Sequence, residues 1–317
     1  METIAAISTA MGSGGIGIIR MTGKDCFKVL KKIFKPKNKE LKDIKGYIID
    51  PDNNEIIDEV LVSFFCEPKS YTMENMCEIN SHGGIIIQKL ILEVCLKNGA
   101  ILAEPGEFTK RAFLNGRIDL SQAESVIELI NSKTDKEAKA SIEQLEGRIS
   151  KNINIIRKDL LNILSDIEAT IDYPEYDIEE VTNNRAMQEL KNVLEKLNKL
   201  EESFKTGKIL KEGIKTIIIG KPNAGKSSLL NLILNADRAI VSDIAGTTRD
   251  TIEEYINIKG IPLKLIDTAG IRETNDIIEE IGVNKSINLI NEADLIISIF
   301  DNSKELDEED YKILKMI

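Results

Sequence analysis

The most constraining feature of this chain is a segment that fits the pattern G-x-x-x-x-G-K-[ST], namely Gly220-Lys221-Pro222-Asn223-Ala224-Gly225-Lys226-Ser227. It follows an apolar run at residues 216–219 and precedes a stretch with helical spacing at residues 227–234. A strand, a glycine-rich loop and a helix in this order bind phosphates, because backbone N–H groups and the helix N-terminus face the anion. We therefore predict a nucleoside triphosphate site in an α/β unit with a mostly parallel sheet.

The chemistry of this loop assigns roles to two side chains. The Lys226 ammonium is expected to reach the β- and γ-phosphates and so to take part in catalysis, and the Ser227 hydroxyl is expected to bind Mg²⁺. The predicted phosphate-binding set in this segment comprises Asn223, Ala224, Gly225, Lys226, Ser227 and Ser228.

Two shorter motifs follow the loop at spacings that suit the same site. Residues 267–270, Asp-Thr-Ala-Gly, end a predicted strand, where Asp267 would hold Mg²⁺ and the N–H of Gly270 would bind the γ-phosphate. Residues 246–250, Gly-Thr-Thr-Arg-Asp, come between the first helix and the second strand, where a threonine can close over the metal. Each motif is weak alone, but the three in this order predict a P-loop GTPase.

The residue after Gly270 departs from a common GTPase pattern. Enzymes of the Ras type place a glutamine there to orient the attacking water, whereas this chain has Ile271, whose side chain forms no hydrogen bond. Hydrolysis must therefore use another group or be slow. The neighbouring candidates are Arg272, Glu273, Glu279 and Glu280.

Composition and charge narrow the class of protein. The 317 residues carry 42 Lys and Arg against 53 Asp and Glu, and they include no Trp. This balance disfavours a protein whose whole surface binds nucleic acid through basic or aromatic side chains. Nine lysines lie between Lys24 and Lys45. We interpret them as a solvated helix face and loop, with a local nucleic-acid contact as the alternative.

Cysteine usage and hydropathy indicate the compartment. Four cysteines without C-x-x-C spacing and the single His82 fit neither a standard zinc site nor a disulfide scaffold. No apolar run approaches the length of a membrane span, and the start of the chain does not read as a signal peptide. We therefore expect a reduced, cytoplasmic protein without a membrane segment.

The hydrophobic pattern changes twice along the chain, so it predicts three kinds of structure. The first part combines short strands at 4–7, 17–21, 47–50, 60–65 and 76–79 with a helix at 85–96. The last part alternates helices with strands at 216–219, 255–258, 263–266 and 295–300.

The middle part, from residue 121 to about residue 204, has helical spacing throughout. Capping boxes are predicted at Ser121 to Glu124 and at Thr134 to Glu137, where helices would begin. Two apolar stripes are interpreted as bundle core rather than as a partner-binding face. They comprise Ile153, Ile156, Leu160, Leu164, Ile167 and Ile171, and Leu190, Val193, Leu197 and Leu200. Tyr173-Pro174-Glu175 is expected to interrupt the helices.

Several stretches of the sequence together resemble the MnmE (TrmE) family of tRNA-modification GTPases. The most specific is Pro-Gly-Glu-Phe-Thr-Lys-Arg-Ala-Phe-Leu-Asn-Gly-Arg at residues 105–117, which continues as Ile-Asp-Leu-Ser-Gln-Ala-Glu. Others are Gly-Gly-Ile-Gly-Ile-Ile-Arg at 14–20, Tyr-Thr-Met-Glu at 71–74, Ile-Asp-Tyr-Pro-Glu at 171–175 and the motif at 246–250. The resemblance implies a multidomain α+β and α/β protein. Its parts would be an N-terminal α+β folate-binding domain at 1–117, an α-helical domain at 118–208 and an inserted P-loop GTPase domain at 209–317.

For the first domain, the resemblance implies a folate site and a homodimer formed around it. Arg20, Glu78 and Arg117 match the family's folate-contacting residues, and the ligand would be 5-formyl- or methylene-tetrahydrofolate. Without the resemblance, surface salt bridges would be the favoured interpretation of Arg20 and Arg117.

For the GTPase domain, the resemblance implies a potassium site beside the nucleotide. The implied K⁺ ligands are Asn223, Ser242, Ile244 and Thr247, and Thr248 would bind Mg²⁺ with Ser227. Glu279 matches the family glutamate that orients the attacking water, and Glu280 is its main competitor for that role. The GTP-binding set then also includes Asp243, Ala245, Gly246, Asp267, Thr268, Ala269 and Gly270.

The implied function is potassium-activated GTP hydrolysis in tRNA wobble-uridine modification of the carboxymethylaminomethyl type. The family acts on tRNA in a heterotetramer with the flavin-dependent protein MnmG. One alternative is a non-catalytic folate-binding dimerisation scaffold, and another is a ribosome- or RNA-associated switch GTPase. The chain reaches Ile317 before an Asn-Lys-x-Asp segment for guanine recognition. We therefore expect weak nucleotide binding without base discrimination, which leaves open whether this stretch is active alone.

Overall fold

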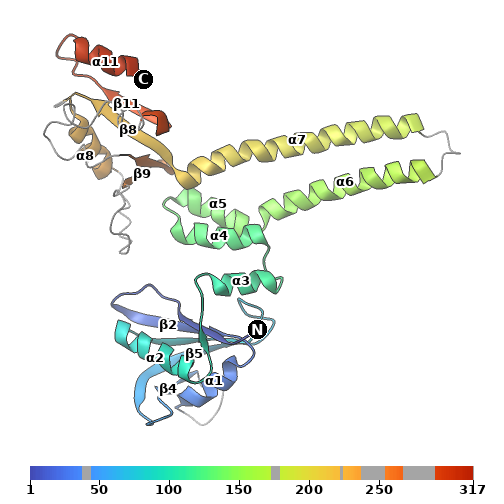
Figure 1. Ribbon diagram of the computed structural model, residues 1–317, viewed down its shortest axis with the longest axis vertical. Coiled ribbons are helices and arrows are strands. Elements are labelled where there is room, and N and C mark those ends of the chain that lie inside the picture. The colour runs from blue at the N-terminus through green and yellow to red at the C-terminus, as the bar shows by residue number, and fades with distance from the viewer. Residues whose placement is uncertain (38–43, 173–178, 222–223, 237–253, 267–289, 317) are drawn as a thin grey trace. The chain divides into compact units, whose positions relative to one another are not determined.

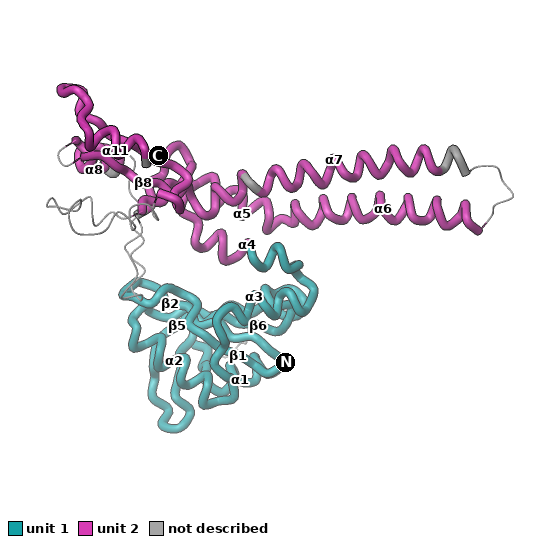
Figure 2. The backbone as a smooth tube through the Cα atoms, turned by 45° about the horizontal axis from the view of Figure 1, so that its top comes forward, with its two compact units in different colours: residues 1–124 teal, residues 125–317 magenta. Residues whose placement is uncertain are grey.

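The computed structural model describes residues 1–37, 44–172, 179–221, 224–236, 254–266 and 290–316. The chain divides into two compact units, Met1–Glu124 and Ser125–Ile317, which Figure 2 draws in separate colours. Across the described residues, no helix combines the length and the apolar character needed to cross a membrane.

The first unit is built on a seven-stranded sheet with the order β3-β4-β5-β6-β2-β1-β7. Its neighbouring strands run antiparallel except for β1 and β7, which are parallel. All five strands predicted for this part of the chain are confirmed, and β3 and β7 were not foreseen because each is very short. The strands are β1 Ile4–Ile7, β2 Gly14–Thr22, β3 Phe34–Pro36, β4 Lys45–Ile49, β5 Ile56–Phe65, β6 Met76–Gly83 and β7 Ile101–Leu102.

Two helices pack with this sheet to form the core of the unit (Figure 1). They are α1 Cys26–Ile33 and α2 Ile85–Lys97, the second of which the helical spacing predicted. The lysines of α1 are exposed, in agreement with the interpretation of a solvated helix face. All four cysteines are free thiols, and Cys26, Cys77 and Cys95 lie in the core. Burial raises the pKa of Cys95 to about 12, so this thiol stays protonated.

Helices connect the sheet of the first unit to the second unit and then dominate the first part of the latter. They are α3 Glu107–Leu114, α4 Leu120–Asn131, α5 Asp135–Leu145, α6 Arg148–Asp172 and α7 Glu179–Glu212. The predicted cap at Thr134 is confirmed, because its side chain accepts a hydrogen bond from the N–H of Glu137 at 3.1 Å. The Glu137 carboxylate in turn accepts the N–H of Lys133 at 2.7 Å.

The predicted capping box at Ser121 is wrong by two residues. Helix α4 begins at Leu120, and Asp119 and Gln122 exchange the reciprocal bonds, each at 2.9 Å, between their side chains and N–H groups. The Ser121 hydroxyl donates to the same Asp119 carboxylate. A carboxylate is the better cap here, because its charge also interacts favourably with the positive end of the helix.

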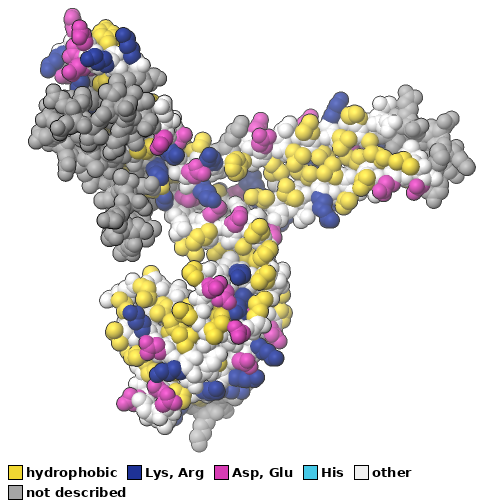
Figure 3. All heavy atoms as spheres, viewed as in Figure 1, with side chains coloured by type: hydrophobic (Ala, Val, Ile, Leu, Met, Phe, Trp, Pro, Cys, Tyr) yellow, Lys and Arg dark blue, Asp and Glu magenta, His cyan; other side chains and the backbone are white. Residues whose placement is uncertain are grey.

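The long helices α6 and α7 form a hairpin that buries only one narrow row of each helix (Figure 1). The buried row comprises Ile156, Ile163, Ala186 and Val193, with Ile167 and Leu200 packed against it. The expectation that the complete stripes form core is therefore wrong for part of each, since two helices can cover only one side of each other. The exposed members are Ile153, Leu160, Leu164, Ile171, Leu190 and Leu197, and Figure 3 shows apolar side chains along this hairpin.

The rest of the second unit is an α/β structure with a four-stranded sheet in the order β11-β8-β10-β9. Strands β10 and β11 run parallel to β8, and β9 is antiparallel to β10, which confirms the predicted mostly parallel sheet. The elements are β8 Ile214–Gly220, α8 Lys226–Ala236, β9 Glu254–Ile258, β10 Ile261–Leu265, β11 Leu295–Ile299 and α11 Glu308–Met316. Ile218, Leu230, Ile256, Leu263 and Leu265 form its core.

Candidate functional site

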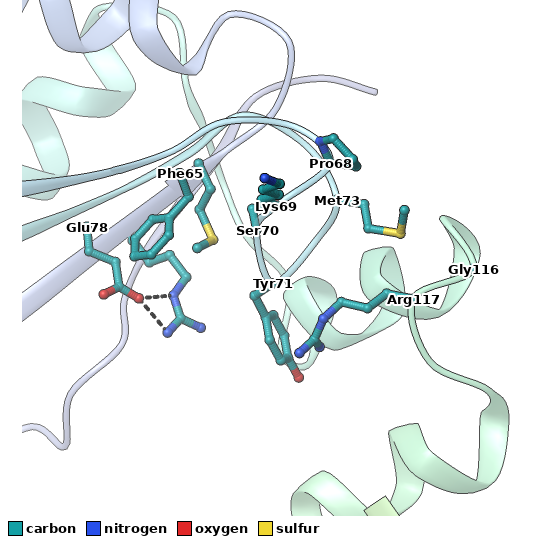
Figure 4. A pocket seen from close by; sticks show the side chains of 11 residues that line it. Phe65, Pro68, Lys69, Ser70, Tyr71, Met73, Glu78, Gly116 and Arg117 are labelled. Carbon is teal, nitrogen blue, oxygen red and sulfur yellow. Dashed lines mark hydrogen bonds and ion pairs between the residues drawn. The ribbon is translucent and has the colours of Figure 1, made fainter. Parts of the chain in front are cut away.

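A cavity of about 710 Å³ opens on the first unit, beside the end of the sheet formed by β2, β5 and β6 (Figure 4). Its lining combines apolar, aromatic and charged side chains from three segments that are distant in the sequence. The lining residues are Arg20, Phe65, Pro68, Lys69, Ser70, Tyr71, Met73, Met76, Glu78, Gly116 and Arg117. The three predicted folate residues are therefore gathered around one cavity.

Strand register places the first two of these residues opposite each other. Arg20 on β2 pairs with Glu78 on β6, and two nitrogens of the guanidinium donate to Glu78 Oε1 at 2.9 and 2.7 Å. Both side chains are partly buried. The two hydrogen bonds fix the orientation of both side chains, so the charged pair forms a polar side of the cavity with defined geometry.

Tyr71 lies between the two arginines of the cavity. The Arg117 guanidinium carbon is 4.7 Å from the centre of its ring, and that of Arg20 is 5.6 Å from it. The Tyr71 hydroxyl shares a hydrogen bond of 2.9 Å with Thr109 Oγ1, and this bond fixes the orientation of the ring. Among the described residues, Arg117 forms no ion pair, so its charge is available to an anionic ligand.

The loop that carries Tyr71 is anchored by a buried polar network. Thr72 and Thr22 share a hydrogen bond of 2.6 Å, and Thr22 also donates to the Glu74 carboxylate at 3.2 Å. Arg111, which is only 4% exposed, donates to Glu74 at 3.2 Å and to Glu107 at 2.8 Å. Because buried polar groups without partners are costly, this closed network determines where the loop lies.

The resemblance to the MnmE family singled out three charged residues of the cavity, Arg20, Glu78 and Arg117, but neither Lys69 nor the apolar walls. Phe65, Met73 and Met76 were not assigned to a site, although Met73 belongs to the Tyr-Thr-Met-Glu stretch at residues 71–74 that resembles the family. Nothing in the local pattern marks them, because a side chain at a strand end looks the same whether it lines a cavity or a core. The salt-bridge interpretation of Arg20 is also correct, since Glu78 is its partner.

The phosphate-binding loop of the second unit has the strand–loop–helix context that the motif requires. Strand β8 ends at Gly220 and α8 begins at Lys226. Gly225 adopts a φ of 102°, a conformation that favours glycine. The N–H of Leu229 bonds the carbonyl of Gly225 at 2.9 Å. The N–H groups of the first helical turn, including those of Ser227 and Ser228, therefore lie at the end of α8 that attracts anions.

Lys226 is held back against the loop by backbone carbonyls. Its Nζ donates to the carbonyl of Gly220 at 2.5 Å and to that of Lys221 at 2.8 Å. Burial lowers the pKa of Lys226 below its ordinary value of 10.5. A phosphate in the loop would favour the charged form, because an adjacent anion stabilises an ammonium that burial disfavours.

The described part of the chain covers only some of the predicted nucleotide-site residues. Ala224, Gly225, Lys226, Ser227 and Ser228 are described. Asn223, Ser242, Asp243, Ile244, Ala245, Gly246, Thr247, Thr248, Asp267, Thr268, Ala269, Gly270 and Glu279 lie outside the described residues. So do Ile271, Arg272, Glu273, Glu280 and the predicted interruption at 173–175. Their roles stay predictions.

Comparison with known proteins adds independent information about this combination of sites. The family model described as GTP-binding protein TrmE N-terminus matches residues 3–117, and the one described as MnmE helical domain matches residues 120–312. The chain belongs to the MnmE family. Its GTP-hydrolase class, predicted from three short motifs, agrees with the names of the family's members.

Three similar members of the MnmE family are each named tRNA modification GTPase MnmE. The protein from Acetivibrio thermocellus is 55% identical over 322 residues, which cover all of this chain and 70% of the relative. The protein from Finegoldia magna is 54% identical over 321 residues and 71% of its length. The protein from Thermoanaerobacter pseudethanolicus is 52% identical over 323 residues and 70% of its length. This level of identity supports the same fold in all of them.

Proposed function

We propose that this chain hydrolyses GTP with potassium activation and acts in tRNA wobble-uridine modification with a folate one-carbon donor. The observation that carries the proposal is the presence, in one chain of the MnmE family, of two separate sites: a phosphate-binding loop whose Lys226 is bound by the loop's own carbonyls, and a cavity lined by Arg117, which forms no ion pair among the described residues. GTP hydrolysis would occur at the loop, and the folate would bind in the cavity.

In the GTPase half, Mg²⁺ would be held by Ser227 and Thr248, with Asp267 assisting through water. K⁺ would be held by Asn223, Ser242, Ile244 and Thr247. A potassium ion between the β- and γ-phosphates would supply positive charge where negative charge develops in the transition state. Glu279 would orient the attacking water, which accounts for the absence of a glutamine at Ile271.

Potassium dependence tests this half of the proposal. GTP turnover by the 317-residue chain is measured in KCl and in NaCl at equal ionic strength, with Mg²⁺ present. We expect faster turnover in KCl, and we expect Asn223→Ala to remove the difference between the two salts. Asn231→Ala, on the exposed side of α8, is the matched control and should retain it. Equal turnover in both salts by the unsubstituted chain would contradict potassium activation.

In the first unit, the cavity suits a folate in size and chemistry. Tyr71 offers an aromatic face, Glu78 offers a carboxylate that could accept from a pterin-like ring, and Arg117 offers a cation for the glutamate tail. The volume of about 710 Å³ falls within the range of small-molecule sites. Either 5-formyl- or methylene-tetrahydrofolate would meet these groups.

Calorimetry with 5-formyl-tetrahydrofolate tests this half separately. We expect binding by the unsubstituted chain, marked weakening in Arg117→Ala and little change in Lys110→Ala, which removes an exposed lysine outside the cavity lining. Equal binding by Arg117→Ala and the unsubstituted chain would argue against the assigned tail contact. Folate binding without any GTP turnover would favour the dimerisation-scaffold alternative.

The proposal extends to assembly and location. The chain would dimerise through its first unit around the folate sites and would join MnmG in a heterotetramer that acts on tRNA in the cytoplasm. Analytical ultracentrifugation with and without folate measures the first step. A chain that stays monomeric at high concentration in the presence of folate would contradict it.

A further inference from the structure

Lys221, the first residue after strand β8, makes side-chain contacts that the phosphate-binding motif does not account for. Its Nζ lies 2.7 Å from Asp310 Oδ2 and also forms an ion pair with Asp307. The Lys221 side chain is 21% exposed and that of Asp310 is 9% exposed, whereas Asp307 is 62% exposed. The contact with Asp310 is therefore largely shielded from water, and the contact with Asp307 is on the surface.

The two aspartates belong to the N-terminal cap of α11. Asp307 Oδ1 accepts the N–H groups of Glu309 at 2.9 Å and Asp310 at 3.2 Å. Asp310 Oδ2 accepts the N–H of Asp307 at 3.1 Å, so the cap is reciprocal. Lys221 bridges both carboxylates of this cap. Burial alone would lower the pKa of Lys221, but the hydrogen bonds to Asp307 and Asp310 outweigh it and raise this pKa. The hydrogen bond from Lys221 in turn lowers the pKa of Asp307.

The backbone of the same residue contacts the phosphate-binding loop. The Lys221 carbonyl accepts a hydrogen bond from Lys226 Nζ at 2.8 Å and another from the N–H of Ala224 at 3.2 Å. Lys221 therefore joins two parts of the unit. Its side chain contacts the start of α11, and its carbonyl binds Lys226, the lysine that is expected to contact the phosphates. The Lys226 ammonium is held by two acceptors, the carbonyls of Gly220 and Lys221, so a shift of the Lys221 peptide would move one of them.

We propose that Lys221 is a positioning residue, which ties the phosphate-binding loop to the cap of α11 and so fixes the carbonyl that orients Lys226. The inference rests on the proposed nucleotide binding at this loop. The shielded contact with Asp310 carries most of the effect, because an ion pair is weakened less by water and salt when it is partly buried. The exposed contact with Asp307 contributes less for the same reason.

The test measures the affinity of the 317-residue chain for a fluorescent N-methylanthraniloyl-GTP in the presence of Mg²⁺ and K⁺. Loss of a charge-assisted bond predicts about tenfold weaker binding by Lys221→Met. Asp310→Asn should weaken binding in the same direction, and adding it to Lys221→Met should cause no further loss. Lys221→Arg keeps the bridge and should restore most of the affinity. Lys215→Met is the matched control, since it removes an exposed lysine from β8, the strand that precedes Lys221.

A purely structural role would give a different result. In that case Lys221→Met would lower the thermal midpoint of the nucleotide-free chain but would bind nucleotide as tightly as the Lys215→Met control, and this outcome overturns the inference. If Lys221→Met does not fold, the comparison of Lys221→Arg with Asp310→Asn decides, because equal affinity in both also overturns it. Absence of nucleotide binding by the unsubstituted chain would refute the proposed function and the inference together. If the chain binds nucleotide and its affinity is unchanged by these substitutions, only the inference is refuted.

Discussion

Arg111 is the residue whose loss should damage the cavity of the first unit most. The residue is 4% exposed, and its guanidinium donates to the carbonyl of Glu2 at 2.7 Å, to Glu107 at 2.8 Å and to Glu74 at 3.2 Å. Replacement by methionine keeps most of the side-chain length but removes every donor. Two carboxylates would then remain, partly buried, without their cation.

The size of the effect follows from this arrangement. Removing one partner of a buried ion pair costs about 3–5 kcal/mol, because the remaining charge is left uncompensated. Domains of this kind are stable by only about 5–15 kcal/mol, so Arg111→Met should consume a large part of the stability of the first unit. The loop with Tyr71 should lose its position first, since Glu74 is held by Arg111.

The measurement is urea unfolding of the full chain combined with hydrogen exchange of peptides from β6, which reports on the first unit alone. Lys110→Met, the adjacent exposed lysine, is the control and should change stability by less than about 0.5 kcal/mol. Adding Glu74→Gln and Glu107→Gln to Arg111→Met should recover part of the loss, because the unpaired charges are then gone. A triple variant less stable than Arg111→Met would refute this reasoning.

Three further outcomes are expected. Gly220→Ala would place a methyl group 2.5 Å from the carbonyl oxygen of Ile299, so it should destabilise the second unit by about 1–3 kcal/mol in urea unfolding. Gly207→Ala lies in open space within α7 and should instead stabilise this unit by about 0.5–1 kcal/mol. Thr134→Ala should cost about 1 kcal/mol through loss of the α5 cap, and Thr134→Ser should not; equal unfolding midpoints for the two would contradict this. The pKa of Glu107 is below its ordinary value of 4.5, since hydrogen bonds from a backbone N–H and a guanidinium outweigh burial. The stability that Glu107 contributes is therefore complete above about pH 4.5 and is lost as the pH falls through the lower pKa of the folded state. Between pH 5 and pH 3, the urea midpoint should drop more for the unsubstituted chain than for Glu107→Gln.

Local patterns predicted secondary structure well and helix packing less well. The runs of β-branched and apolar residues in β1, β4 and β5, and the helical spacing in α2, involve only neighbouring residues, which is why they were visible in the sequence. The stripe on α6 has the same spacing on its covered and its exposed sides. Which side is covered depends on α7, and a pattern within one helix carries no information about the other.

The cap of α4 illustrates the same limit at a smaller scale. Both Ser121 and Asp119 are residues that cap helices, and each is followed three positions later by Glu or Gln. The structure selects Asp119, whose reciprocal bonds with Gln122 start the helix at Leu120. Two competing caps differ by only a few tenths of a kcal/mol in local energy, so their choice falls to the surrounding chain.

The phosphate-binding loop and its order relative to the strands and helices could be identified from the amino-acid sequence alone. All of its chemistry lies in consecutive residues, and its conformation follows from glycine and from the end of α8. The residues of the cavity were grouped only through the resemblance to the MnmE family, and the Lys221 bridge was not predicted, because Arg20 and Glu78 are 58 residues apart and Lys221 and Asp310 are 89 apart. Strand register and the packing of α11 bring these side chains together, and both depend on burial of distant surfaces, which no short segment of sequence encodes.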